Sequence, residues 1–288
     1  DPPVMDELKW MLITANPSVA RYAEACGVHR IFVDMESLGK AERQKHLSAH
    51  MASHTFEDVA AVAGVLSDAE LMVRLNPLHA GTAEEVDGAI EHGARRLMLP
   101  MFRRPEEVER FLGLVGGRVP VTLLAETPEA LTRLSTYMDG LGSRDEVHFG
   151  LNDLSLAMGL NYLFEPLAAR LLELAVALLR ERGIPFGFGG VARIGQGELP
   201  AEWVLSEHVR LGSSWVILSR AFHGGADCVE ALVEKLDLSD ELHRLRLTEN
   251  ALRAGDAHLL ESNRQRLEKQ VFAIAGDFVT LDERILSR

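Results

Sequence analysis

Short apolar runs, each followed by a polar break and a helical pattern, recur along the whole chain. The runs are rich in β-branched and aliphatic residues, and the segments between them carry apolar residues at three- and four-residue steps. Continuous apolar strands that alternate with helices are typical of a parallel sheet covered on both faces. Eight such units in one chain favour an α/β fold closed into a (β/α)8 TIM barrel over an open sheet. The eight runs comprise residues 10–17, 30–37, 70–77, 96–102, 119–128, 146–153, 184–190 and 214–222.

Helix-start signals follow several of these runs. Proline stands near the first helical position in the pairs at 16–17, 104–105 and 127–128, where its missing N–H leaves no hydrogen bond unmade. Thr55 and Asp58 have the spacing of a capping box ahead of the third run. These signals predict helices that begin directly after their strands.

The pattern changes at about residue 230. Residues 1–230 form the predicted catalytic barrel, and residues 231–288 carry a charged helical pattern that predicts a C-terminal helical extension. We expect this extension to pack on the barrel or on a neighbouring subunit. The longest connection between a strand and its helix, residues 37–54, is a candidate active-site loop.

Composition narrows the classes of function. The 288 residues, 47% of them hydrophobic, suit one large soluble domain. The net charge of -13 argues against nucleic acid or an anionic membrane as partner, because both favour basic patches. Cys26 and Cys228 lack disulfide-framework or metal-ligand spacing, so a reducing cytoplasm is expected. The first ten residues do not resemble a signal peptide, and no apolar run is long enough to predict a membrane span.

Polar residues stand where the apolar runs end. Catalytic groups of such barrels come from the carboxyl ends of different strands, so these residues are expected to share one mouth. Four carboxylates and two guanidinium groups are more than solubility demands. The residues are Asn16, Asp34, Glu36, Arg74, Asn76, Glu126, Asn152, Asp153 and Arg220.

Glu126 and Asp153 follow adjacent predicted strands and are the best candidate metal ligands. Mg²⁺ is usually held by one or two carboxylates together with water and substrate oxygens. Alternatively, the two residues only cap the helices that follow. Arg74 closes an apolar run, and its planar guanidinium would suit a carboxylate or an enolate oxygen. An internal ion pair of Arg74 with Asp34 or Glu36 is the alternative, and it is compatible with the functional role.

Two further features carry weaker signals. His46, His50 and His54 are spaced by four residues and would share a helix face, which suits a metal site, a single acid or base, or a solvated surface. The glycine-rich segment 187–200 could hold a phosphate through its backbone N–H groups, as loops after the seventh strand often do in barrels, or it could only permit a tight turn. Arg193 and Arg220 favour the phosphate interpretation.

The ordered segments RIFVDMES, VRLNP, GARRLMLPMF, LAETPEAL and HFGLNDLSLAMGL resemble the HpcH/HpaI aldolase/citrate lyase superfamily, in particular its class II pyruvate aldolases. The resemblance covers roughly residues 10–222. It implies a barrel enzyme, and in many members a homo-oligomer that exchanges C-terminal helices.

The resemblance also implies a chemistry. Mg²⁺ or Mn²⁺ would be bound by Glu126 and Asp153, and a small 2-oxo acid such as pyruvate or oxaloacetate would chelate that cation. Arg74 would stabilise the enolate and Asp34 would organise water at the cation. The reaction would make or break a carbon–carbon bond with an aldehyde or a thioester as the second substrate.

The other polar residues near the strand ends complete the predicted site. We expect Glu36 among the catalytic groups, with Arg74 and Asp34. Residues Ser37, Asn152 and Arg220, together with Arg74, are expected to bind substrate.

The sequence departs from the family after the second strand. Aldolases of this family typically have D-x-E-H there, whereas this chain has DMES with Ser37 in the histidine position. Serine alone is a poor base at neutral pH. A loop histidine or water at the cation could replace it, or the reaction could differ from retro-aldol cleavage. The citrate lyase β-subunit branch also lacks this histidine, so cleavage of a CoA thioester stays open, as does a barrel without catalysis that serves a biosynthetic pathway.

Overall fold

Eight parallel strands close into one barrel in the computed structural model, which describes residues 7–39 and 54–277. The order is β1 to β8, and β1 pairs with both β2 and β8, so the sheet has no open edge. The predicted (β/α)8 barrel is confirmed. The strands are β1 (Lys9–Ile13), β2 (Arg30–Asp34), β3 (Glu70–Arg74), β4 (Arg96–Leu99), β5 (Val121–Ala125), β6 (Glu146–Phe149), β7 (Phe186–Val191) and β8 (Trp215–Leu218).

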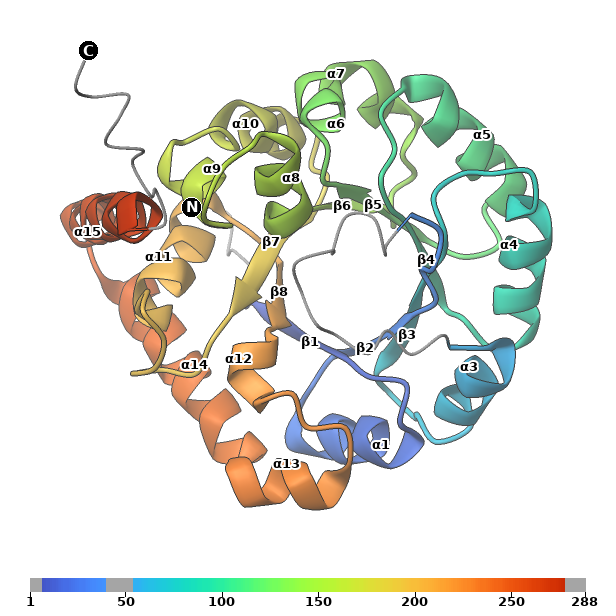
Figure 1. Cartoon of the computed structure of the whole chain (residues 1–288), viewed down its shortest axis with the longest axis horizontal. Coiled ribbons are helices and arrows are strands. Elements are labelled where there is room, and N and C mark those ends of the chain that lie inside the picture. The colour runs from blue at the N-terminus through green and yellow to red at the C-terminus, as the bar shows by residue number, and fades with distance from the viewer. Residues whose placement is uncertain (1–6, 40–53, 278–288) are drawn as a thin grey trace, which may run out of the picture.

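Helices surround the barrel in the alternating order that the sequence predicts (Figure 1). Those between the strands are α1 (Pro17–Cys26), α3 (Phe56–Ala63), α4 (Thr82–Glu91), α5 (Pro105–Val115), α6 (Pro128–Thr132), α7 (Leu134–Tyr137), the short 3-10 helix η1 (Met138–Gly140), α8 (Leu151–Ala157), α9 (Glu165–Ala168), α10 (Glu173–Glu181) and α11 (Ala201–Leu211). After β8 come α12 (Arg220–His223), α13 (Val229–Lys235), α14 (Leu238–Ala254) and α15 (Ala257–Asp277).

The predicted helix starts are confirmed. Helices α1, α5 and α6 each have proline in the first turn. Asn16 caps α1, because its side-chain oxygen accepts hydrogen bonds from the backbone N–H groups of Ser18 and Val19 at 2.9 and 3.3 Å. The capping box of α3 is present, with the backbone N–H of Thr55 donating to the Asp58 carboxylate at 2.8 Å.

The barrel interior is layered. Charged residues that begin strands β2, β3, β4 and β6 fill the amino-terminal end, and an apolar layer lies beyond them. The apolar layer consists of Met11, Phe32, Met72, Met98, Leu124 and Trp215. These residues separate the amino-terminal charges from the polar groups at the carboxyl ends of the strands.

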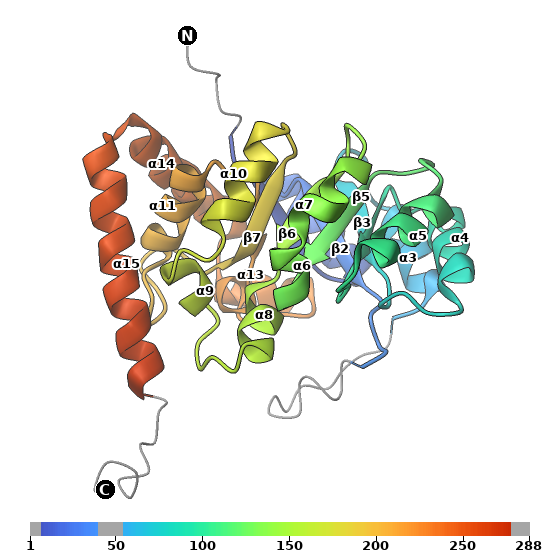
Figure 2. The same ribbon diagram turned by 90° about the horizontal axis from the view of Figure 1, so that it is seen from above.

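The C-terminal helices pack on one flank of the barrel. Helices α14 and α15 both contact α11, and α15 runs along the outside of the molecule (Figure 2). Glu249 of α14 is fully buried and accepts a hydrogen bond from the backbone N–H of Leu8 at 2.8 Å, which ties α14 to the start of β1. The division at residue 230 and the contact with a neighbouring subunit stay predictions.

Candidate active site at the carboxyl ends of the strands

Arg74 and Asp34 form a bidentate ion pair at the end of β2 and β3. The two residues are register partners on adjacent strands, and Arg74 Nε and Nη2 donate to the two carboxylate oxygens of Asp34 at 2.9 and 2.7 Å. Glu36 approaches the same guanidinium at 3.6 Å. The ion pair considered for Arg74 from the sequence is therefore present, and it fixes the plane of the guanidinium at the mouth of the barrel.

Arg74 is protonated and positively charged at any accessible pH. Burial alone would lower the pKa of this guanidinium, but the carboxylate of Asp34, followed by those of Glu36 and Glu126, raises the pKa above its ordinary value. Glu126 follows β5, so it acts on Arg74 from another strand of the barrel. Arg74 is thus a fixed positive charge that contacts the carboxylates of Asp34 and Glu36.

Glu126 directly follows β5 and is almost completely buried, with 2% of the residue exposed. Its Oε1 accepts a hydrogen bond from the backbone N–H of Met101 at 3.1 Å. Met101 has a positive φ of 56°, a left-handed conformation that is uncommon for a residue other than glycine. This conformation at the end of β4 coincides with a backbone donor at the Glu126 carboxylate.

Gly150 leaves room for the same carboxylate. A Cβ atom at Gly150 would lie 2.7 Å from Glu126 Oε2, so a larger residue at the end of β6 would displace the glutamate. Glycine is therefore required here by the close approach of a side chain from the neighbouring strand.

Asp153 lies in the helix after β6, whereas the sequence predicted it at the end of that strand. The register pairs Ala125 with Phe149, so Glu126 is level with Gly150, and Asp153 sits in the first turn of α8. Asp153 is partly buried. The helix caps are Thr127 and Gly150, so neither candidate metal ligand occupies the N-cap position of the helix that follows it.

The backbone of Ser37 is hydrogen-bonded to the side chain of Asn76. The backbone N–H groups of Ser37 and Leu38 donate to Asn76 Oδ1 at 2.8 and 2.9 Å, and Asn76 Nδ2 donates to Glu85 Oε1 at 2.6 Å. The same Glu85 oxygen lies 2.7 Å from His79 Nε2. This chain of contacts fixes the start of the loop after β2.

The remaining predicted residues are placed around the rim. Asn152 is exposed on α8, and Arg220 is exposed at the start of α12 after β8. His54 pairs with Asp58 at 3.7 Å. His46 and His50 lie outside the described residues, so the three-histidine hypothesis stays a prediction.

The structure therefore pairs Arg74 with Asp34 and Glu36, and it places Glu126 after β5, Asp153 in α8 and Arg220 after β8 at the same end of the barrel. Sequence reasoning missed Met101, because a backbone donor with positive φ leaves no trace in a side-chain pattern. It also missed the pair of His79 and Glu85, although a histidine six residues before a glutamate after VRLNP was visible.

A protein-family model described as HpcH/HpaI aldolase/citrate lyase matches residues 10–163. These residues include most of β1, all of β2 to β6, and every polar group of the mouth except Arg220. The chain belongs to this family. Members of the HpcH/HpaI family are generally lyases or related enzymes and are generally dependent on a divalent metal.

Solved structures share the fold of this HpcH/HpaI protein. An HpcH/HpaI aldolase from Desulfitobacterium hafniense DCB-2 superposes with a TM-score of 0.58 at 17% identity, covering 80% of this chain and 94% of the other. An aldolase/citrate lyase family protein from Burkholderia cenocepacia J2315 has a TM-score of 0.55 at 16% identity, covering 86% and 95%.

The citrate synthase SbnG has a TM-score of 0.56 at 14% identity, covering 75% of this chain and 87% of its own. At these identities the likeness concerns the fold. No curated protein is significantly similar to the chain.

The donor set suits a divalent cation. Glu126 and Asp153 follow neighbouring strands, and Mg²⁺ needs only one or two protein carboxylates when water and substrate complete its shell. Within residues 7–39 and 54–277, no cluster of three or more His, Cys, Asp or Glu side chains could hold a metal. The two-carboxylate metal site stays a prediction. In the same ranges, no helix is long and apolar enough to cross a membrane.

Proposed function

We propose that this protein is a divalent-metal-dependent carbon–carbon lyase that acts through the enolate of a small 2-oxo acid, pyruvate or oxaloacetate. The observation that carries the proposal is the Arg74 guanidinium, fixed by Asp34 at 2.7 and 2.9 Å at the same end of the barrel as the buried carboxylate of Glu126. Membership of the HpcH/HpaI family supports the aldolase or lyase class.

Arg74 is the electrostatic element of this site. Asp34 occupies Nε and Nη2, and Nη1 makes no hydrogen bond to any residue that the structure describes. Nη1 can donate to the oxygen on which negative charge develops when a 2-oxo acid becomes an enolate. A preorganised donor of this kind stabilises the enolate more than the ketone.

Glu126 and Asp153 would hold Mg²⁺ or Mn²⁺, and the cation would polarise the carbonyl group of the 2-oxo acid. Met101 orients Glu126 through its backbone N–H, and Glu36 adds negative charge that retains Arg74 in place. Asn152 on α8 and Ser37 after β2 lie at the same end of the barrel and would contact the substrate.

The proton-transfer group at C3 is not the residue that is usual in this family. Ser37 is exposed, and its hydroxyl approaches only Asn76 Oδ1, at 3.4 Å, among the described residues. Without a partner base, serine does not remove a proton efficiently at neutral pH. Loss of CO2 from oxaloacetate gives the enolate directly and needs no base at C3.

This difference defines the test of the proposal. Purified protein with Mg²⁺ or Mn²⁺ is expected to decarboxylate oxaloacetate faster than it exchanges the methyl protons of pyruvate for deuterium, both followed by NMR. Ser37→His should raise the exchange rate. Arg74→Lys should lower decarboxylation roughly 10²-fold, the scale for loss of an aimed donor. Arg95→Lys, on an exposed side chain before β4, is the matched control and should leave the rate unchanged.

Absence of both activities with every cation tried would contradict the proposal. The Ser37 departure would then favour the alternative of a CoA-thioester lyase or condensing enzyme, and after it a barrel without catalysis. Wild-type decarboxylation that survives Arg74→Lys unchanged would leave Arg74 as a structural partner of Asp34.

A further inference from the structure

Four basic side chains gather at the barrel rim beside β7 and β8, away from the Arg74 and Asp34 pair. Arg193 lies two residues after β7, and Arg220 and His223 belong to α12 directly after β8. Lys235 ends α13. The neighbouring strands β7 and β8 end at the same mouth, where α12 follows β8, and α13 lies further out, next to α1 (Figure 1).

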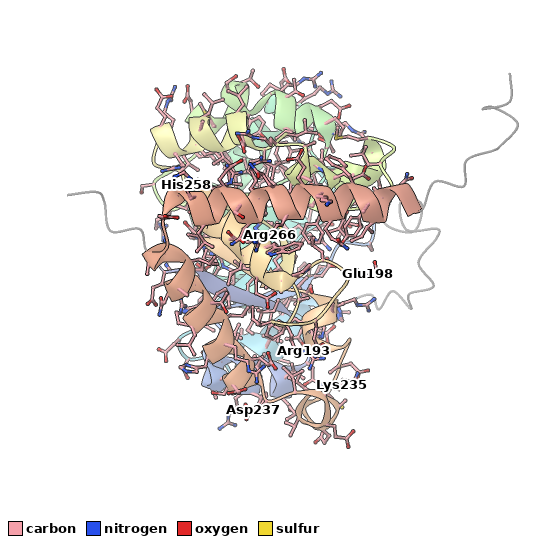
Figure 3. All side chains as sticks on the ribbon, turned by 90° about the vertical axis from the view of Figure 1, so that its left-hand side faces the viewer. Arg193, Glu198, Lys235, Asp237, His258 and Arg266 are labelled. Atoms are coloured by element: carbon pink, nitrogen blue, oxygen red, sulfur yellow. The ribbon has the colours of Figure 1, made fainter. Side chains whose placement is uncertain are left out.

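Direct contacts join the members of this group, named here the basic rim. Arg193 Nη1 donates to the backbone carbonyl of Lys235 at 3.3 Å, and Figure 3 shows the two side chains next to each other. Lys235 Nζ in turn donates to the carbonyl of Gly224 at 2.7 Å, at the end of α12. The loop after β7 and the segment after β8 are thus held together by their cations.

His223 lies inside this group and is 9% exposed. Its pKa is lowered first by burial and then by the positive charges of Arg220 and Lys235. Geometry places Lys235 here as well, because its ammonium group donates to the carbonyl of Gly224, the residue after His223. Neither ring nitrogen hydrogen-bonds to a residue in the described ranges. A neighbouring anion would be favoured by all three side chains at once.

Within the part of the chain that the structure describes, no Asp or Glu oxygen lies within 4.0 Å of the Arg193, Arg220 or Lys235 nitrogens. Arg193 Nε is buried and has no acceptor among the described residues. An unsatisfied buried donor is costly, so an acceptor supplied by a ligand would stabilise this arrangement.

Glu202 is an acidic residue that contacts the loop after β7. Its Oε1 accepts from the backbone N–H of Gly195 at 3.1 Å, and its Oε2 is buried without a donor. Glu202 therefore holds the glycine-rich loop and does not pair with Arg193. In a chain with a net charge of -13, three neighbouring cations that pair with no described carboxylate are a local exception.

We propose that the basic rim of Arg193, Arg220, His223 and Lys235 binds the phosphate group of a phosphorylated second substrate. Guanidinium groups match phosphate oxygens, and several cations favour a dianion over a single carboxylate. Loops after the seventh and eighth strands frequently bind phosphate in barrels of this type. The identity of the second substrate rests on the proposed function, whereas binding of phosphate by the rim is tested without it.

The probe is inorganic phosphate, with metal and 2-oxo acid absent from every sample. The pKa of His223 is followed by NMR of its ring protons, assigned with His223→Asn, in sodium phosphate and in sodium chloride of equal ionic strength. Phosphate should raise the pKa of His223 in a saturable manner, because the anion favours the protonated ring.

Two variants that each lose one positive charge distinguish phosphate binding at the basic rim from a general effect of net charge. Arg220→Gln, on an exposed side chain, should weaken phosphate binding at least about fivefold, as expected for the loss of one charge-assisted contact. Arg144→Gln, exposed before β6 at the opposite end of the barrel, should leave binding unchanged.

An unchanged pKa of His223 in phosphate would overturn the proposal, as would equal weakening by both variants. Succinate that shifts His223 while phosphate does not would also overturn it, because the rim would then select carboxylates. These outcomes are independent of decarboxylation and methyl exchange, so failure of the rim and failure of the lyase proposal are distinguishable.

Discussion

Four charged side chains close the amino-terminal end of the barrel interior. Arg30 pairs with Glu70 at 2.7 Å and with Glu146, and Arg96 pairs with Glu70 at 2.9 Å. Glu146 also accepts from the hydroxyl of Thr122 at 2.8 Å. Two positive and two negative groups balance in a space from which water is largely excluded, since Arg30 is 1% and Glu146 is 4% exposed.

Glu146→Gln removes one negative charge from this layer while preserving shape. In this variant the buried Arg30 keeps only Glu70 as an ion-pair partner, and Glu70 also pairs with Arg96. Breaking a buried ion pair by removing one partner typically costs about 3–5 kcal/mol. Because the amide oxygen of glutamine can still accept from Thr122 or Arg30, we expect a loss of about 3 kcal/mol in the free energy of unfolding.

The pH dependence follows from the same contacts. Burial raises the pKa of Glu146, but Arg30 and Arg96 outweigh it and the folded-state pKa is lowered. Its stabilising contribution is therefore complete above the ordinary carboxyl pKa of about 4.3 and is lost as the pH falls below that value. The free energies of unfolding of the wild type and of Glu146→Gln, measured with urea, should therefore become more similar as the solution is acidified.

Urea denaturation followed by circular dichroism measures the difference at neutral pH. Asp139→Asn is the control, because it breaks an ion pair with Arg182 in which both side chains are at least half exposed, and it should cost less than about 1 kcal/mol. The double variant Arg30→Met with Glu146→Leu removes both charges and should be less destabilised than the sum of its single variants. A cost below 1 kcal/mol for Glu146→Gln, or strict additivity in the double variant, would refute this account.

Three other predictions follow from the site and the core. Titration calorimetry should detect Mg²⁺ or Mn²⁺ binding to the wild type that Glu126→Gln and Asp153→Asn each weaken, and equal binding by all three proteins would place the cation elsewhere. Burial lowers the pKa of His148 to about 4, so the free energy of unfolding should fall as the pH drops below about 6.5. In urea unfolding measured down to pH 5.5, His148→Gln should make the free energy of unfolding depend less on pH. Gly187→Ala would place a Cβ 2.4 Å from the Trp215 carbonyl oxygen and should cost about 1–3 kcal/mol, whereas Gly113→Ala, with open space around its Cβ, should not destabilise.

The sequence by itself determined the architecture of this protein. Strand and helix periods are local properties, and each of the eight apolar runs contains most or all of one strand. The positions of Arg74 and Glu126 at the mouth were predictable for the same reason, because the carboxyl ends of all strands in a parallel barrel lie at the same end of the barrel. The helix starts at Pro17, Pro105 and Pro128 depend on contacts within a few residues and were equally predictable.

The tertiary structure decided which polar groups meet. Residues at the starts of strands, such as Arg30 and Glu146, are 116 positions apart in sequence and become partners only when strand tilt and register are fixed. Donation from the backbone of Met101 to Glu126 depends on a left-handed residue whose conformation no side-chain pattern encodes. Register also moved Asp153 from the strand end into α8. Local patterns specify elements, whereas the electrostatic environment of each group depends on distances between elements that only the closed barrel sets.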